Sequence, residues 1–150
     1  MQHPTTLARR IDARAAVHSA GVVALVWTGV IHLEQYAIAR YSTVPTIGTL
    51  FLLNFIAATA LGPALLVPIF VPVWPSAPRT RRWIDTAAVL GGLALAAGSL
   101  AALLISEHTP LFGFMEHGYR FVITETIAVE AVAIVALGAV LAWPADEDAG

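Results

Sequence analysis

The stretch of sequence that decides the fold runs from Ala15 to Ala39 and reads AAVHSAGVVALVWTGVIHLEQYAIA. It contains no arginine or aspartate, and its one glutamate, Glu34, lies near its end. An α-helix rises about 1.5 Å per residue, so a helix of this length exceeds the ~30 Å thickness of a bilayer's hydrocarbon core. We therefore predict that this stretch crosses a membrane.

Three further apolar stretches are also long enough to cross a membrane, and they cover Thr46–Val73, Trp83–Ile105 and His117–Trp143. Lipid offers no hydrogen bonds to a bare backbone, and the alternation typical of a barrel strand is missing, so each stretch must be helical. The sequence predicts an all-α polytopic membrane protein with a bundle of four transmembrane helices. Residues 15–143 form the membrane domain, between an N-terminal tail (1–14) and a C-terminal tail (144–150).

Composition agrees with this interpretation and excludes several functions. Of the 150 residues 58% are hydrophobic and 12% are charged, with a mean hydropathy of +0.77. The absence of cysteine excludes disulfides, thiolate metal sites and cysteine nucleophiles. The formal net charge of -2 argues against nucleic acid as a partner. Neither a G-x-S-x-G elbow nor a phosphate-binding G-x-x-x-x-G-K-[ST] loop occurs, which leaves open whether the protein is an enzyme.

The distribution of arginine predicts the orientation in the membrane. Three arginines precede the first stretch and three separate the second from the third, whereas each of the other two connections holds one; in chain order they are Arg9, Arg10, Arg14, Arg40, Arg79, Arg81, Arg82 and Arg120. Cytoplasmic connections are enriched in positive charge. We therefore expect a multi-pass protein of the cell membrane, with both termini in the cytoplasm.

Several polar residues fall inside the predicted spans at a similar depth. Counted from Ala15, His32 lies about 25 Å from the inner boundary, and counted back from Trp143, Glu125 lies about 27 Å from it. Asn54 lies about 12 Å below the outer start of the second helix, close to the same level. One polar layer in the outer half of the bundle could therefore contain His32, Asn54 and Glu125.

A second acid, Glu130, falls closer to the middle of the membrane. Its neighbours Ala128, Val129, Ala131 and Val132 favour the protonated form of the carboxyl group. Residues five apart differ by about 140° around a helix, so Glu125 and Glu130 do not share one narrow face. Ionisable residues in a span usually have a function, and we include both acids among the candidate ligand-binding residues.

These residue types suit several ligands. His32, His117 and Glu125 offer the imidazole and carboxylate ligands of a divalent metal, and paired histidines could hold a haem. The same outward-facing pocket, formed by His32, Asn54, Glu125 and Glu130, could instead bind a quinone or another lipophilic molecule. No spacing such as H-E-x-x-H occurs, so the sequence does not decide among these ligands.

The alternative is a non-catalytic accessory or assembly subunit, either as a homo-oligomer or in a larger membrane complex. Small size favours this interpretation, and the small residues Gly91, Gly92, Ala96 and Gly98 would let the third helix approach a neighbour closely. In that case the polar residues would serve only as hydrogen bonds between helices.

Four segments carry a resemblance to known proteins: IHLEQY (Ile31–Tyr36), VPTIGTLFLLN (Val44–Asn54), LFGFMEHGYR (Leu111–Arg120) and VEAVAIVAL (Val129–Leu137). They resemble small four-span integral membrane proteins of high-GC actinobacteria, a group without an assigned activity. In size and in the polar end of its first helix the chain is also loosely similar to DoxX-like proteins. The resemblance implies a four-helix fold, and it implies no activity and no functional residue.

Overall fold

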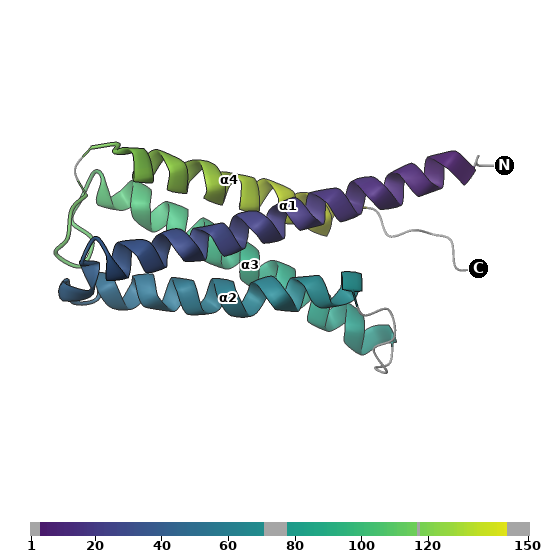
Figure 1. Ribbon diagram of the computed structural model, residues 1–150, viewed down its shortest axis with the longest axis horizontal. Helices are drawn as coiled ribbons and strands as arrows, with labels where there is room; N and C mark the ends of the chain where they lie inside the picture. The colour runs from purple at the N-terminus through teal and green to yellow at the C-terminus, as the bar shows by residue number, and fades with distance from the viewer. Residues whose placement is uncertain (1–3, 71–77, 117, 144–150) are drawn as a thin grey trace.

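The computed structural model describes residues 4–70, 78–116 and 118–143. These residues form four helices, α1 (Pro4–Ala37), α2 (Ile47–Phe70), α3 (Pro78–Ser106) and α4 (Phe121–Ala142), and a short 3-10 turn, η1 (Tyr41–Thr43). The described residues contain no β-strand, only an isolated bridge between Leu111 and Phe114. The predicted all-α four-helix architecture is thus confirmed (Figure 1).

Each helix contains a segment that is long and apolar enough to cross a membrane, and these segments are Ala13–Ala37, Ile47–Leu66, Arg82–Ser106 and Phe121–Ala142. Large apolar side chains such as Val23, Leu53 and Val135 are more than half exposed on the surface of the bundle. Such side chains suit contact with lipid rather than water. The chain is therefore a multi-pass membrane protein.

Two helix ends differ from the sequence prediction. Helix α1 begins at Pro4, before the predicted span, since proline is accepted in a first helical turn and the residues after it favour a helix. Helix α4 begins at Phe121 instead of His117, because Gly118 has a positive φ of 82° and Arg120 has an extended backbone. The first turns of α1 project beyond the other helices (Figure 1).

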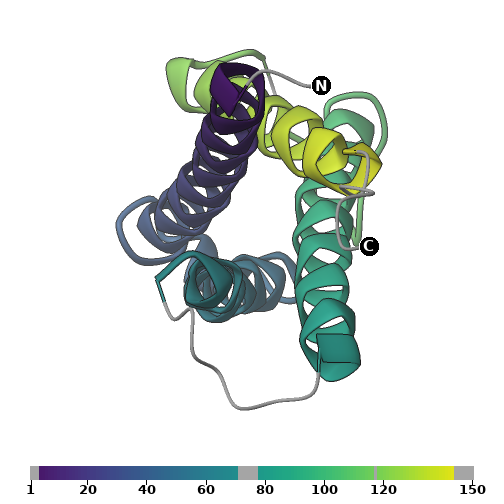
Figure 2. The same cartoon turned by 90° about the vertical axis from the view of Figure 1, so that its right-hand side faces the viewer.

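The helices form a ring in the order α1, α2, α3, α4 (Figure 2). Helix α1 packs extensively against α2 and α4, whereas the seam between α2 and α3 has the sparsest contacts between ring neighbours. The connections 38–46 and 107–120, the latter without residue 117, lie together at one end of the bundle, which we call the Tyr41 end (Figure 1). Because consecutive helices run in opposite directions, α1 begins and α4 ends at the other end.

The hydrophobic core lies toward the end opposite Tyr41. It is formed by buried side chains from all four helices, which we call the packed core: Val22, Ala24, Leu25, Leu65, Ala88, Val89, Ala96, Ala133, Leu137 and Val140. Leu25 and Leu137 have no exposed surface. Gly92 allows this close packing, because a Cβ atom there would lie 2.9 Å from Leu137 Cδ1 and 3.2 Å from Leu25 Cδ2. Helix α3 is therefore held firmly in this half of the bundle.

Candidate ligand-binding cavity

A cavity of about 560 Å3 occupies the half of the bundle near the Tyr41 end. Residues from all four helices line it, and most of these residues are apolar. On α2 the lining residues Leu50, Leu53 and Ile56 are 40%, 53% and 51% exposed. Because contacts between ring neighbours are sparsest between α2 and α3, we infer that the cavity opens toward lipid at this seam.

Small residues on α3 create this space. Ala94, Gly98 and Ala102 line the cavity and follow one another at intervals of four residues, which places them on one face of the helix. A Cβ atom added to Gly98 would meet no other atom within 4 Å. Gly92, six residues earlier on the same helix, is covered by side chains of neighbouring helices. Helix α3 is therefore closely packed at Gly92 and no longer so at Gly98.

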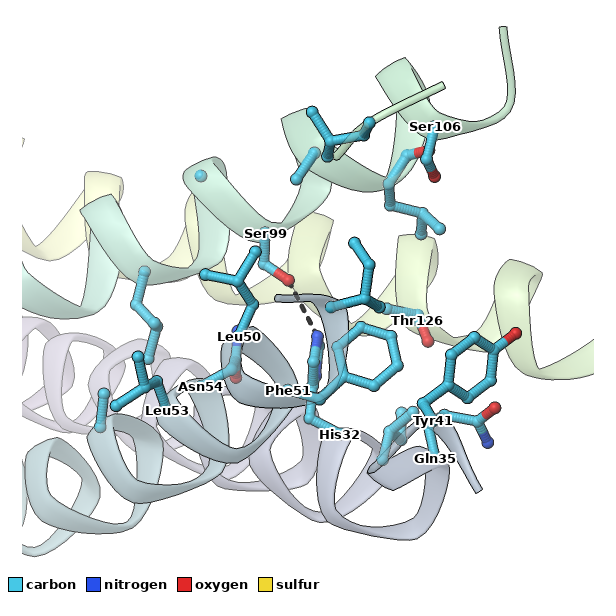
Figure 3. A pocket seen from close by; sticks show the side chains of 18 of the residues that line it. His32, Gln35, Tyr41, Leu50, Phe51, Leu53, Asn54, Ser99, Ser106 and Thr126 are labelled. Atoms are coloured by element: carbon cyan, nitrogen blue, oxygen red, sulfur yellow. Dashed lines mark hydrogen bonds between the residues drawn. The ribbon is translucent and has the colours of Figure 1, made fainter. Parts of the chain in front are cut away.

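His32 on α1 lies in the cavity wall and has a hydrogen bond at each ring nitrogen. Its Nδ1 lies 2.8 Å from the carbonyl oxygen of Thr28, and its Nε2 lies 3.1 Å from Ser99 Oγ on α3 (Figure 3). Because a carbonyl oxygen only accepts, Nδ1 must carry a proton. In the neutral imidazole, Nε2 then accepts, and the Ser99 hydroxyl donates to it.

Asn54 on α2 lines the same cavity, so the structure brings two of the predicted ligand-binding residues together. Asn54 is 7% exposed, and its Oδ1 has no hydrogen-bond partner among the described residues. Thr28 Oγ1, one turn of α1 before His32, is also buried without a partner. Buried polar atoms are usually hydrogen-bonded, so these two atoms could still bind a hydrogen-bonding ligand.

Glu130 on α4 is fully buried and does not line the cavity. Neither of its carboxylate oxygens has a hydrogen-bond partner within the described part of the chain. Ser99, which bonds to His32, is the polar side chain that interacts with it. Glu130 lies nine residues after the start of α4, or about 13 Å along the helix, and so falls well inside the span.

Glu125 lies elsewhere, so the structure does not bring it together with His32. Its Oε1 accepts a hydrogen bond of 3.0 Å from Trp27 Nε1 on the surface shared by α1 and α4. Trp27 and His32 are five residues apart and therefore point about 140° away from each other. Glu125 is four residues from the start of α4, near the end of the span, where such a polar pair suits the membrane interface.

The predicted metal ligands do not form a cluster that the structure describes. Among residues 4–70, 78–116 and 118–143, no three histidine, aspartate or glutamate side chains gather as metal ligands would. His117 lies outside the described residues, so the set His32, His117 and Glu125 stays a prediction. In the arrangement described, however, neither ring nitrogen of His32 is free to bind a metal or a haem iron.

Tyr41, Glu116 and Arg120 close the Tyr41 end of the cavity. The Tyr41 hydroxyl donates to Glu116 Oε2 (2.9 Å), and Arg120 Nη2 donates to Glu116 Oε1 (2.7 Å) and to the Tyr41 hydroxyl (3.1 Å). Burial raises the pKa of Tyr41 above its ordinary value, and the hydrogen bond to Tyr41 raises that of Arg120. Both therefore keep their protons at neutral pH, which lets each donate to the buried Glu116.

Aromatic rings extend this closure toward His32. The ring of Phe51 lies 5.1 Å from those of His32 and Tyr41, measured between centroids, and Tyr41 also packs 5.5 Å from Phe114. The chain turns sharply at Phe112 and Gly113, whose φ angles are 52° and 79°, and this turn pairs Leu111 with Phe114. Phe114 and Glu116 are thereby directed into the cavity from the α3–α4 connection.

Sequence reasoning gave no functional role to Ser99 or Tyr41. Ser99 could have been found by counting depth along the helix. It lies seven residues, or about 10 Å, before the end of α3, at a level similar to that of His32. For Tyr41 the sequence contains no such signal, because its partners Glu116 and Arg120 lie 75 and 79 residues away in the chain.

Comparisons with known proteins show no matching family model, no similar curated protein and no similar solved structure. The resemblance to actinobacterial and DoxX-like four-span proteins thus stays a prediction. Function must be argued from the cavity and the residues around it.

Proposed function

We propose that this protein binds a lipophilic small molecule with a polar ring or head group, such as a quinone, taken up from the bilayer between α2 and α3. The observation that carries this proposal is a largely apolar cavity of about 560 Å3 that contains the His32–Ser99 pair and is lined on α2 by partly exposed side chains. Ligand pockets typically measure about 300–1,000 Å3 and combine apolar walls with a few polar groups. The cavity has both properties.

The polar residues suit a head group that both accepts and donates hydrogen bonds. The Asn54 amide can donate to a carbonyl oxygen, and the Ser99 hydroxyl can accept from a hydroxyl group while it donates to His32. The apolar tail of such a molecule would lie along Leu53 and Ile56 toward the lipid. The proposal thus keeps His32 and Asn54 from the sequence prediction, assigns Glu125 to the surface, and leaves the type of any reaction unassigned.

We further propose that the Tyr41 end faces outward from the cytoplasm and that the membrane is the cell membrane. Support comes from the arginines, which are concentrated before α1 and between α2 and α3. A fusion of a cysteine-free reporter to either end, assayed for protease access in intact cells, tests the orientation. Cleavage at the start of α1 in intact cells would reverse it.

A matched pair of glycines tests the binding proposal. Gly98 lines the cavity and Gly138 on α4 does not, yet a Cβ atom at either position meets nothing within 4 Å. Gly98→Phe should fill the cavity and weaken binding of a decyl-substituted benzoquinone at least about tenfold, or 1.4 kcal/mol. Gly138→Phe should leave the dissociation constant unchanged. Calorimetric titration of both variants in lipid nanodiscs measures this difference.

Two results would overturn the proposal. One is equal affinity of both variants for the benzoquinone, and the other is no binding to the unmodified protein.

Metal analysis and an absorption spectrum of the same sample test the metal and haem alternatives that involve His117. Copurification with a larger complex, without binding, would instead favour an accessory subunit. For such a subunit, Gly91 and Gly92 of α3 would not form the contact face for a partner, because they already lie against Leu61 and Leu137 inside the bundle.

A further inference from the structure

The bundle contains one acid that the cavity alone does not explain. Glu130 is 0% exposed, and both of its oxygens lack a hydrogen-bond partner among the described residues. A charged carboxylate in such an apolar place is very unfavourable, and the group is normally neutral there. A neutral Glu130 carries a proton that it can donate.

The ionisable groups around Glu130 leave one route for that proton. Helix α2 contains no ionisable residue at all, and α3 contains none between Asp85 near its start and its end at Ser106. On α1 the ionisable side chain at this level is His32, and on α4 Glu125 faces outward to Trp27. The other charged groups of this half lie further toward the Tyr41 end: Glu34 and Arg40 are exposed, Glu107 lies in the α3–α4 connection, and Glu116 bonds to Arg120.

Ser99 lies where this route must pass. Its hydroxyl lies 3.1 Å from His32 Nε2, its side chain interacts with Glu130, and the residue lines the cavity. Figure 3 shows Ser99 beside His32 in the cavity wall. Since its side chain also interacts with Glu130, Ser99 is the junction between the buried acid, the histidine and the cavity. A hydroxyl group can donate one hydrogen bond and accept others at the same time, which is the property that a junction requires.

We propose that Glu130, Ser99 and His32 form a proton relay that connects the buried carboxyl group of α4 to the cavity. In this relay, Glu130 O–H comes to donate to Ser99 Oγ, a bond that the described arrangement does not contain, while Ser99 O–H donates to His32 Nε2. Transfer breaks the O–H bond of Glu130 and forms an N–H bond on His32, while Ser99 gains one proton and loses another. The products are a carboxylate and an imidazolium, and total charge is unchanged.

The bond from His32 Nδ1 to Thr28 prepares the ring for this role. It fixes the tautomer in which Nε2 is the basic nitrogen, and it remains in place when the ring becomes an imidazolium. The charge pair that results from transfer is unfavourable in an apolar interior, so transfer should require a partner in the cavity. A bound molecule that takes a proton from His32, or that places negative charge beside it, supplies that partner.

Infrared spectroscopy tests the relay without any ligand. The unmodified protein in nanodiscs at neutral pH should show the carbonyl band of a protonated carboxylic acid, and Glu130→Gln should abolish it. Glu125→Gln, the matched control on the same helix, should retain it. Ser99→Ala should shift the band because its hydrogen bond is lost, and Ser99→Thr should restore the original position. A band that persists in Glu130→Gln, or whose position is unchanged in Ser99→Ala, would overturn the relay.

The use of the relay by a bound molecule rests on the proposed function, and a second measurement separates the two. Binding of an alkyl-substituted hydroxynaphthoquinone, an anion at neutral pH, titrated in buffers of different ionisation enthalpy, should take up protons in the unmodified protein and in Glu125→Gln but not in Glu130→Gln. Equal proton uptake in all three would contradict the relay while leaving binding intact. If the quinone does not bind, the proposed function fails, and the infrared band alone decides whether the relay exists.

Discussion

The packed core and the cavity are built from the same helices and the same kinds of residues, yet one is filled and the other is open. In the packed core, Leu25 and Leu137 both lie against Gly92, and neither has any exposed surface. Around the cavity, Leu53 points partly outward and Gly98 faces open space. The comparison teaches that one helix, α3, carries both regions: its small residues are covered by neighbouring side chains at Gly92 and are left uncovered at Gly98.

Truncation of a leucine should show the largest difference between the two regions. Leu25→Ala removes a fully buried side chain of the packed core and should lower the free energy of unfolding by about 2–5 kcal/mol. Leu53→Ala removes a side chain that is 53% exposed beside the cavity and should cost much less. Unfolding in mixed detergent micelles measures both values. Equal losses would show that the cavity wall is as tightly packed as the core.

Removal of the Tyr41 hydroxyl should give the second largest loss of unfolding free energy, because this hydroxyl helps to close the end of the cavity. Tyr41→Phe removes the hydrogen bond to the buried Glu116 and should cost about 1–3 kcal/mol. Tyr119→Phe, at an exposed side chain, serves as the control. If both substitutions cost the same, the closure at the Tyr41 end contributes no stability.

The same tyrosine predicts a loss of stability at alkaline pH. Burial raises the pKa of Tyr41 in the folded protein above the ordinary value of about 10, so the folded state holds this proton more tightly than the unfolded state. The resulting stability is fully present below pH ~10 and is lost as pH rises through the folded pKa. Unfolding of the unmodified protein and of Tyr41→Phe between neutral and alkaline pH measures it. Parallel pH profiles would contradict the prediction.

Alanine at Gly92 and at Gly98, both on α3, should change the free energy of unfolding in opposite directions. Gly92→Ala places a methyl group against Leu137 and Leu25, and such overpacking typically costs about 1–3 kcal/mol before the gain in helix propensity. Gly98→Ala meets no obstacle and should stabilise the protein by up to about 1 kcal/mol through helix propensity. Thermal unfolding of the two variants decides the sign. A gain at both positions would mean that the packed core is looser than the distances indicate.

The smallest effect is expected at the surface pair of Trp27 and Glu125. This hydrogen bond lies on the outer face of α1 and α4, away from both regions. Glu125→Gln keeps an oxygen that can accept from Trp27, so the free energy of unfolding should change by less than about 1 kcal/mol. A larger loss in the same micelles would reveal a role for this carboxylate that the structure does not show.

The sequence was sufficient for the fold but only in part for the site, and the reason is physical. Length and hydropathy define a membrane span locally, so four helices could be predicted with their order. Depth could also be counted along each helix, and His32 and Asn54 do line one cavity. Direction around the helix axis could not be predicted, because it depends on the packing of neighbours. Glu125 consequently faces the surface, and Ser99 was missed.

If a ligand enters the cavity sideways between α2 and α3, as we propose, it would exchange with the membrane and not with the aqueous phase on either side. Its supply is then a two-dimensional search within the bilayer, and occupancy depends on the mole fraction of that molecule among the lipids. Dissociation constants should accordingly be expressed per lipid, and dilution of the nanodiscs with buffer should leave the cavity equally filled.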